Sequence, residues 1–319
     1  MQSCSGWRST LRSAVELWQA YQFEAAVQEC LAYLHPVLGA PRPEAAPSLL
    51  SHAQLAIVIA CGGRGSRWGD FLGLPKHMVD PGEGLPLVQR TLLQLRERFP
   101  GARLYLLLGE EQLIHFAPIQ HADILVRRSH PDALLALEVL EGQSHVWDTS
   151  SGLLWLHGDV FFSDAAMQKI SEELALRPDQ LKCFGRKGQN QAHWNDDGEG
   201  FGWYVPNGSA DVLRDWCLLT RQIYIGSLMR RLSSWEIVAL ISYARRQGYT
   251  RRDELVNSGQ PPMDMMTCVM DHFARRDFAE DLWVEIDDET EDFEFPFEYF
   301  RRLVLRVKTS GVKLESRGR

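Results

Sequence analysis

Short apolar runs alternate with amphipathic segments through the middle of the chain. The run LAIVIA at 55–60 has no polar residue, and the runs at 103–108 and 153–157 are nearly as apolar. Runs of this length, bounded by glycine or polar residues, are typical of buried strands. Between them, apolar residues recur every three to four positions, which predicts helices over 87–98 and 164–176.

The order of these segments predicts the fold class. Further patterns at 111–116, 124–126 and 131–140 continue the alternation, and Ser163 is placed to cap the helix at 164–176. Strands that alternate with helices form parallel βαβ units, so we expect an α/β fold with a doubly wound, mostly parallel sheet. Ligands of such sheets bind at the carboxyl ends of the strands.

The pattern changes after residue 180. Segments 182–186 and 201–205 are typical of two strands joined by a polar loop, which we interpret as a β-hairpin insertion near 181–206. Residues 210–274 are mainly helical in pattern, with Trp216 among their core candidates. We expect these helices to pack on the sheet or to form a lid.

The two ends of the chain differ from the middle. Apolar residues at helical spacing over 10–35 predict a helical hairpin that turns at 19–22, or one bent helix, and a proline-rich linker follows. We expect this appendage to be a packing element or a contact in a homo-oligomer. A final helix at 296–307 is favoured over a tail that binds phosphate. The predicted units are 1–50 (hairpin and linker), 51–300 (main domain) and 301–319 (basic C-terminal tail).

Composition narrows the classes of function. The chain has 319 residues, a net charge of −8 and a pI of about 5.7, which argue against nucleic-acid binding because that needs a basic face. No apolar run is long enough for a transmembrane helix, and charged residues interrupt the N-terminal segment where a signal peptide would be apolar. The six cysteines form no C-x-x-C pair, which is typical of reduced thiols. We therefore expect a cytoplasmic protein with no membrane span and no nucleic-acid partner.

The candidate chemistry begins directly after the strand at 55–60. The sequence ACGGRGSRWGDFLGLPK runs from Ala60 to Lys76 and contains glycines at 62, 63 and 65. Such glycines let the backbone approach anionic oxygens closely, and Arg67 and Lys76 add positive charge. The spacing fits neither G-x-x-x-x-G-K-[ST] nor G-x-G-x-x-G. We interpret the run as a polyphosphate-binding loop of another kind.

This run resembles the signature of a known family. The nucleotidyltransferases of the sugar-phosphate and molybdenum-cofactor type, which have a GT-A-like fold, carry G-G-x-G-[ST]-R-[ML]-G followed by P-K. This chain has GGRGSRWG at 62–69 and then Pro75-Lys76, with Trp68 in place of the usual Met or Leu. Gly158-Asp159 and Glu285-Ile-Asp287 also resemble segments of the family, so the resemblance extends over most of the chain.

The resemblance implies roles for individual residues. Asp159 and Asp287 would supply carboxylate ligands to Mg²⁺, a hard cation that prefers oxygen. From the residues alone, Gly158-Asp159 also fits a turn or a helix cap, and the acidic stretch at 285–288 also fits a solvated rim. Arg67, Lys76 and Asp159 are the implied catalytic residues. The implied nucleotide-binding set is Cys61, Gly62, Gly63, Gly65, Ser66, Arg67 and Lys76.

The hairpin near 181–206 resembles the region where related enzymes hold their second substrate. Arg186 could contact a phosphate group, and Trp203 or Tyr204 could pack on a sugar or an ammonium group. Glu285 is a further candidate for acceptor binding. The same residues also fit a solvated hairpin with its aromatic rings in the core.

These inferences lead to one hypothesis and two alternatives. The chain would transfer a nucleotidyl group from an NTP, with CTP or UTP favoured, to a phosphorylated sugar or a small alcohol phosphate, with Mg²⁺ and with release of pyrophosphate. A GT-A-type glycosyltransferase would use a sugar nucleotide, but it usually has an Asp-x-Asp motif, which Gly158-Asp159-Val160-Phe161 lacks. A non-catalytic nucleotide-binding regulator would not need Lys76, Asp159 and Asp287 together.

Overall fold

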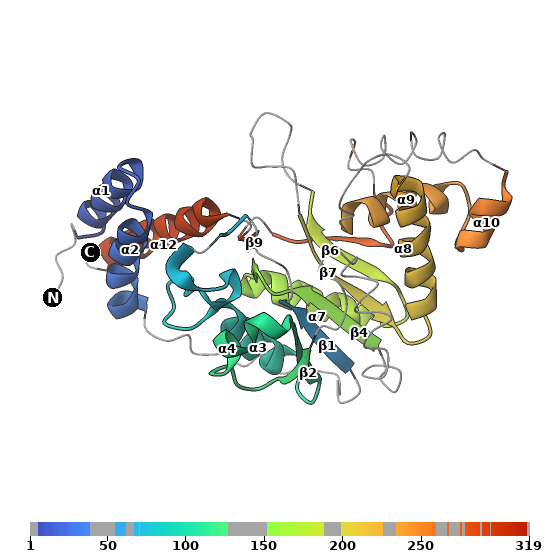
Figure 1. Cartoon of the computed structure of the whole chain (residues 1–319), viewed down its shortest axis with the longest axis horizontal. Coiled ribbons are helices and arrows are strands. Elements are labelled where there is room, and N and C mark those ends of the chain that lie inside the picture. The colour runs from blue at the N-terminus through green and yellow to red at the C-terminus, as the bar shows by residue number, and fades with distance from the viewer. Residues whose placement is uncertain are drawn as a thin grey trace.

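The computed structural model in Figure 1 shows helices on both sides of a twisted sheet, with a group of helices from the two ends of the chain beside it. The structure describes residues 6–38, 55–61, 67–69, 71–126, 152–187, 199–225, 234–259, 267, 275, 278–287, 289–293 and 295–317. The predicted loop residues 62–66 and the predicted helix at 131–140 lie outside the described residues.

Seven described strands form one sheet in the order β3-β2-β1-β4-β7-β6-β8. All neighbouring pairs are parallel except those that β7 makes with β4 and β6, so β7 alone runs against the other six. The α/β class and the mostly parallel sheet are thus confirmed. The strands are β1 (Leu55–Ala60), β2 (Arg103–Leu108), β3 (Asp123–Val126), β4 (Gly152–His157), β6 (Lys182–Arg186), β7 (Glu199–Pro206) and β8 (Trp283–Glu285).

The sheet is covered on both faces, which explains why its central strands are apolar at every position. In β1 all six residues are buried. Ile57 and Ile59 pack with helices α3 (Leu87–Arg98) and α7 (Asp164–Leu176), whereas Ala56 and Val58 pack with the helices of the other face. Those helices are α8 (Ala210–Ile225) and α9 (Ser234–Arg246). The doubly wound arrangement is therefore also confirmed.

Several local predictions agree closely with the structure. Strands β1 and β2 and helix α3 have the predicted bounds. The Ser163 side chain caps α7, since its Oγ accepts a hydrogen bond from the Ala166 N–H at 2.9 Å. The described short helices are α4 (Leu113–Phe116), α10 (Arg252–Asn257) and 3₁₀ turns at Phe71–Gly73, Lys76–Met78 and Glu110–Gln112.

The strands predicted near 181–206 belong to the main sheet. They are β6 and β7, which pair with each other, while β7 also pairs with β4 and β6 also pairs with β8. Most of their residues are buried, because helices cover both faces of the sheet here as well. A two-stranded ladder of β5 (Val160–Phe161) and β9 (Glu291–Asp292) lies outside the main sheet.

The two ends of the chain meet in a group of three helices. The first segment is a hairpin of α1 (Gly6–Gln19) and α2 (Phe23–Leu38), and α12 (Pro296–Arg317) packs against both (Figure 1). The predicted final helix at 296–307 is part of α12, which continues to Arg317 through residues predicted as a tail. Its Leu303 and Val307 are buried in the apolar cluster of this group. The domain boundaries near 50 and 300 stay a prediction. None of the described helices is both long and apolar enough to cross a membrane.

Candidate active site

The candidate site is built at the carboxyl ends of β1 and β4. These strands are parallel neighbours, with Ala60 opposite His157 in the register. The Cys61 N–H donates to the Leu107 carbonyl, and the Gly158 N–H donates to the Ala60 carbonyl, both at 2.9 Å. Cys61 and Asp159 therefore lie side by side at one edge of the sheet, where ligands of doubly wound folds bind.

Lys76 and Asp159 form an ion pair at this edge. Lys76 begins a 3₁₀ turn that follows Pro75, and Asp159 lies two residues after the end of β4. Their side chains are only 12% and 17% exposed, respectively. The structure thus brings together two of the three predicted catalytic residues.

The surroundings of Asp159 keep it ionised. Burial alone raises the pKa of this carboxyl group, but the positive charge of Lys76, followed by His77 and His157, outweighs burial and holds the pKa well below its usual value. Burial also lowers the pKa of His77 to about 4, with Asp159 opposing this shift and Lys76 adding to it. The same three influences lower the pKa of His157. Near neutral pH, Asp159 is therefore an anion between uncharged imidazoles.

Cys61 and Gly158 account for the tight packing beneath this pair. Cys61 is fully buried, and burial, followed by the charge of Asp159, raises the pKa of its thiol well above the usual value. A Cβ atom at position 158 would lie 2.3 Å from the Cys61 sulfur. Glycine is therefore required at position 158, and the thiol acts as a small packing group.

Asp287 is held in a different way from Asp159. Its Oδ2 accepts a hydrogen bond from the Ser163 hydroxyl at 2.6 Å. Its Oδ1 accepts from the N–H groups of Glu289 and Thr290, at 2.9 and 3.1 Å. The carboxylate closes a turn after β8 and at the same time contacts the residue that caps α7.

The segments that carry Asp159 and Asp287 are bonded to each other. Strand β5 directly follows Asp159 and pairs with β9, and the Phe293 N–H donates to the Asp159 carbonyl at 3.0 Å. The Ser163 N–H donates to the Thr290 hydroxyl at 3.1 Å. Among the described residues, no group of three or more His, Cys, Asp or Glu side chains is placed to hold a metal ion.

The residues after the glycine-rich run connect the site to α12. Arg67 is exposed, and its guanidinium carbon lies 5.7 Å from the centre of the Phe295 ring. Trp68 is buried, donates from Nε1 to the Leu74 carbonyl at 3.0 Å and packs beside Tyr299. The larger side chain in place of the usual Met or Leu thus fills the space against the last helix.

The structure gives the four predicted acceptor residues different surroundings. Trp203 is fully buried in the core, and Tyr204 is buried with its hydroxyl donating to the Pro178 carbonyl. Arg186 pairs with Glu199 at 3.6 Å. Glu285 is exposed and accepts hydrogen bonds from the Lys187 N–H and the Trp283 indole, both at 2.7 Å. The two aromatic rings are therefore explained by packing in the sheet.

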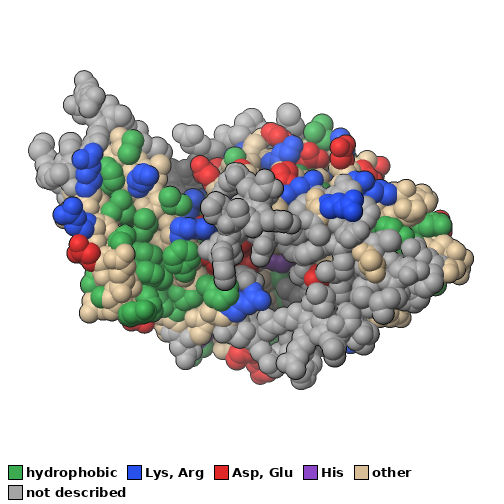
Figure 2. All heavy atoms as spheres, turned by 90° about the horizontal axis from the view of Figure 1, so that it is seen from above, with side chains coloured by type: hydrophobic (Ala, Val, Ile, Leu, Met, Phe, Trp, Pro, Cys, Tyr) green, Lys and Arg blue, Asp and Glu red, His purple; other side chains and the backbone are tan. Residues whose placement is uncertain are grey.

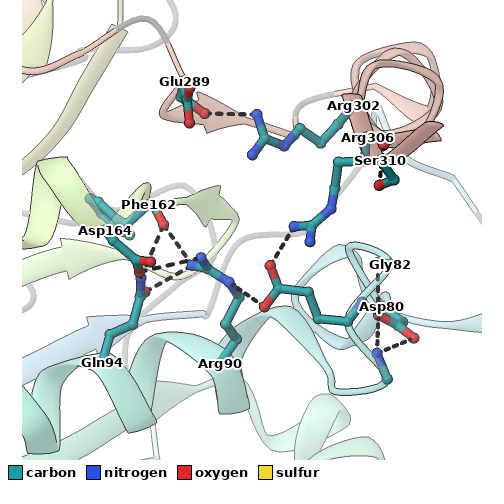
Figure 3. Close-up of polar contacts among 12 residues, drawn as sticks. Asp80, Gly82, Arg90, Gln94, Phe162, Asp164, Glu289, Arg302, Arg306 and Ser310 are labelled. Atoms are coloured by element: carbon teal, nitrogen blue, oxygen red, sulfur yellow. Dashed lines mark hydrogen bonds and ion pairs between the residues drawn. The ribbon is translucent and has the colours of Figure 1, made fainter. Parts of the chain in front are cut away.

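A buried charge network next to the site has no counterpart in the sequence predictions (Figure 3). Glu83 accepts hydrogen bonds from Arg90 of α3 and from Arg306 of α12. Arg90 also donates to the Phe162 carbonyl at 2.6 Å. The guanidinium carbons of Arg90 and Arg302 lie 4.1 and 3.9 Å from the centre of the Phe161 ring. No local pattern marks the contacts of Glu83 with Arg306 or of Arg90 with Phe162, because these partners are far apart in the sequence.

Seen from above, the molecule is hollowed near its middle, and a histidine side chain is visible inside the hollow (Figure 2). Acidic side chains line part of its edge. The helices from the ends of the chain present a broad apolar surface on one side of this hollow.

No family model matches the sequence, and neither does any curated protein. The chain is similar in structure to the Rv0371c homologue of Mycobacterium sp. strain JC1, with 15% identity, a TM-score of 0.45, and coverage of 81% of this chain and 99% of that one. Rv0371c of Mycobacterium tuberculosis H37Rv has 14% identity and a TM-score of 0.43, with coverage of 80% of this chain and 100% of that one. A UDP-glucose pyrophosphorylase solved with UDP-glucose has 10% identity and a TM-score of 0.45, with coverage of 80% of this chain and 98% of that one. The chemistry of this chain has to be inferred from its own side chains.

Proposed function

We propose that this chain is a Mg²⁺-dependent nucleotidyltransferase that joins the nucleoside monophosphate of an NTP to a phosphorylated sugar or a small alcohol phosphate. CTP or UTP is the proposed nucleotide. The observation that carries the proposal is the largely buried Lys76–Asp159 ion pair at the carboxyl ends of β1 and β4. This pair offers a cation for phosphate and an anion for metal at the edge of the sheet where β1 leads into the glycine-rich run.

The reaction is a displacement at phosphorus. An oxygen of the acceptor's phosphate attacks the α-phosphorus of the NTP, the bond from that phosphorus to the bridging β-phosphate oxygen breaks, and pyrophosphate leaves. A phosphate monoester is already anionic near neutral pH, so no general base is needed. Catalysis then rests on positioning and on charge neutralisation.

The chain's own groups divide this work. In the proposal, the run at 62–66 lies around the triphosphate, with Arg67 and Lys76 on its oxygens. Lys76 would exchange its contact with Asp159 for a contact with the α-phosphate or the attacking phosphate. The direct contact between the Lys76 ammonium group and the Asp159 carboxylate supports such an exchange.

The chemical type of the proposed ligands suits Mg²⁺. Asp159 and Asp287 offer carboxylate oxygens, which are the ligands Mg²⁺ prefers. The hydrogen-bonded strands β5 and β9 join the segments that carry these two residues, which supports the assignment. When bound, Mg²⁺ would supply positive charge to the α-phosphate and so favour attack at phosphorus. Releasing Asp159 from Lys76 would make its carboxylate available as a ligand.

Pyrophosphate release tests the proposal. The full chain is assayed with Mg²⁺, each of four NTPs and a panel of sugar phosphates and alcohol phosphates. We expect release with one NTP and one acceptor, and loss of release with EDTA or in Asp159→Asn. Asp253→Asn, which changes an exposed carboxylate on α10, is the matched control. Sugar transfer from a sugar nucleotide, or nucleotide binding without release from any pair, would overturn the proposal.

A further inference from the structure

We propose that Arg302 is a positioning residue that holds the Asp159 and Asp287 segments in one arrangement. It contacts the first through the ring of Phe161 and the second through the carbonyl of Glu289. The inference rests on the proposed function for its activity measurements. It assigns a role in that site to the C-terminal helix.

The contact with the Asp287 segment is short and direct. The Arg302 guanidinium donates from Nη1 to the Glu289 carbonyl at 3.2 Å, as Figure 3 shows. The Glu289 N–H donates in turn to Asp287 Oδ1 at 2.9 Å. The Thr290 N–H, which shares a peptide unit with the Glu289 carbonyl, also donates to Asp287 Oδ1, at 3.1 Å. A single peptide unit therefore links Arg302 to one of the groups that orient the Asp287 carboxylate.

The contact with the Asp159 segment passes through an aromatic ring. Phe161 lies two residues after Asp159 and is paired with Glu291 in the β5–β9 ladder. The Arg302 guanidinium carbon lies 3.9 Å from the centre of its ring, within the range of a favourable cation–π contact. The same guanidinium thus contacts β5 of the ladder and the segment that leads from Asp287 into β9.

Arg302 keeps its charge although it is half-buried. Burial, followed by the charge of Arg306, lowers its pKa to about 10, while Glu291 and Glu289 oppose the shift and Arg90 adds to it. The nearby arginines are balanced by acids, since Glu83 pairs with Arg90 and Arg306, and Glu291 pairs with Arg301. Arg302 is therefore a cation near neutral pH.

Stability alone does not explain a guanidinium here. Buried charges can often be replaced by apolar side chains of similar volume at little cost to the fold. Glu291 keeps Arg301 as its partner if Arg302 is removed. A methionine at 302 would fill the space and keep the fold, but it would lose the bond to the Glu289 carbonyl and the charge over Phe161.

The test compares Arg302→Met, Arg302→Lys and Lys308→Met. Lys308 is an exposed cation on the same helix, so its replacement is the matched control. For Arg302→Met we expect kcat to fall about tenfold or more, since small misplacements of catalytic groups are costly, with KM for the NTP within about twofold. We also expect a higher Mg²⁺ concentration for half-maximal activity and a melting temperature close to that of the wild type. Arg302→Lys keeps the cation over the ring and should recover part of kcat.

Hydrogen exchange gives a readout that needs no turnover. The Phe293 amide donates to the Asp159 carbonyl, and the Glu289 and Thr290 amides donate to Asp287. These three amides should exchange faster in Arg302→Met and unchanged in Lys308→Met. If the wild type released no pyrophosphate, the proposed function would fall and this exchange would still decide the positioning role.

Three results would overturn the inference. The first is an unchanged kcat in Arg302→Met, and the second is unchanged exchange of the three amides. The third is a parallel fall of kcat, nucleotide affinity and melting temperature that Arg302→Lys does not relieve, since this would indicate a merely structural role.

Discussion

Asp159 and Asp287 are the same kind of group held in two different ways. Asp159 is held by charge, in an ion pair with Lys76 and close to His77 and His157. Asp287 is held by hydrogen bonds from one hydroxyl and two backbone N–H groups. An ion pair can exchange its partner for a substrate phosphate, whereas a turn that is closed by three hydrogen bonds keeps its geometry. The site thus combines one exchangeable carboxylate with one fixed carboxylate.

Removing each carboxylate charge tests this difference with the largest expected effect. We expect Asp159→Asn and Asp287→Asn both to lower kcat by about a thousandfold, since each removes charge that the transition state needs. Asp287→Asn should keep the turn, because an amide oxygen still accepts from the two N–H groups. Steady-state pyrophosphate release is the measurement, with Asp253→Asn as the control. Activity within tenfold of the wild type in either variant would exclude that carboxylate from catalysis.

The ion pair itself can be examined through stability. Lys76→Met leaves a buried carboxylate without its partner, which we expect to cost about 3 kcal/mol of unfolding free energy. The double variant Lys76→Met/Asp159→Asn should recover most of this loss. Urea unfolding of the four proteins forms a double-mutant cycle. Additive losses would show that the two side chains do not interact, and Lys169→Met, on the exposed face of α7, controls for loss of a lysine.

One of the hydrogen bonds that hold Asp287 comes from Ser163. This hydroxyl donates to Asp287 and accepts from the Ala166 N–H at the start of α7. Ser163→Ala should lower the free energy of unfolding by about 1–2 kcal/mol, as for loss of a helix cap. It should also lower kcat without changing the interaction between Lys76 and Asp159. Thermal unfolding and turnover are measured together. A stability equal to that of the wild type would contradict the capping role.

The last effect concerns pH. Burial raises the pKa of Glu199 to about 7, so its contribution to stability is full below about pH 4.5 and is lost as the pH rises to 7. His77 has the opposite sign, since a pKa of about 4 against 6.5 when unfolded means that stability is lost as the pH falls from 6.5 to 4. In Glu199→Gln only the second slope remains.

We therefore expect the stability of Glu199→Gln to fall on acidification from pH 6.5 to 4.5, by up to about 1.4 kcal/mol per pH unit relative to the wild type. Urea unfolding at three pH values measures this slope. Glu24→Gln, at an exposed position on α2, should follow the wild type. Parallel profiles for Glu199→Gln and the wild type would show that Glu199 titrates normally.

The sequence predicts local features well and distant pairings poorly. The apolar run at Leu55–Ala60 and the amphipathic helix Leu87–Arg98 are determined by neighbouring residues, and their bounds were predicted correctly. Lys76 and Asp159 were each predicted as functional, but their ion pair was not. Trp203 could not be distinguished from an exposed aromatic residue, because a strand buried on both faces has no polar alternation that marks an outward side. Glu83 and Arg306 are 223 residues apart and carry no local signal.

The contact between Glu83 and Arg306 also bears on how the chain folds. Helix α12 follows every other described element, and its contacts with the loop before α3 span most of the sequence. The βα units around β1 and β2 close short loops and can form early, whereas contacts at such separations form late. During synthesis, a nascent chain therefore holds Lys76, Asp159 and Asp287 before it holds Arg302. We expect the Asp159 and Asp287 segments to reach their final arrangement only after α12 has been made.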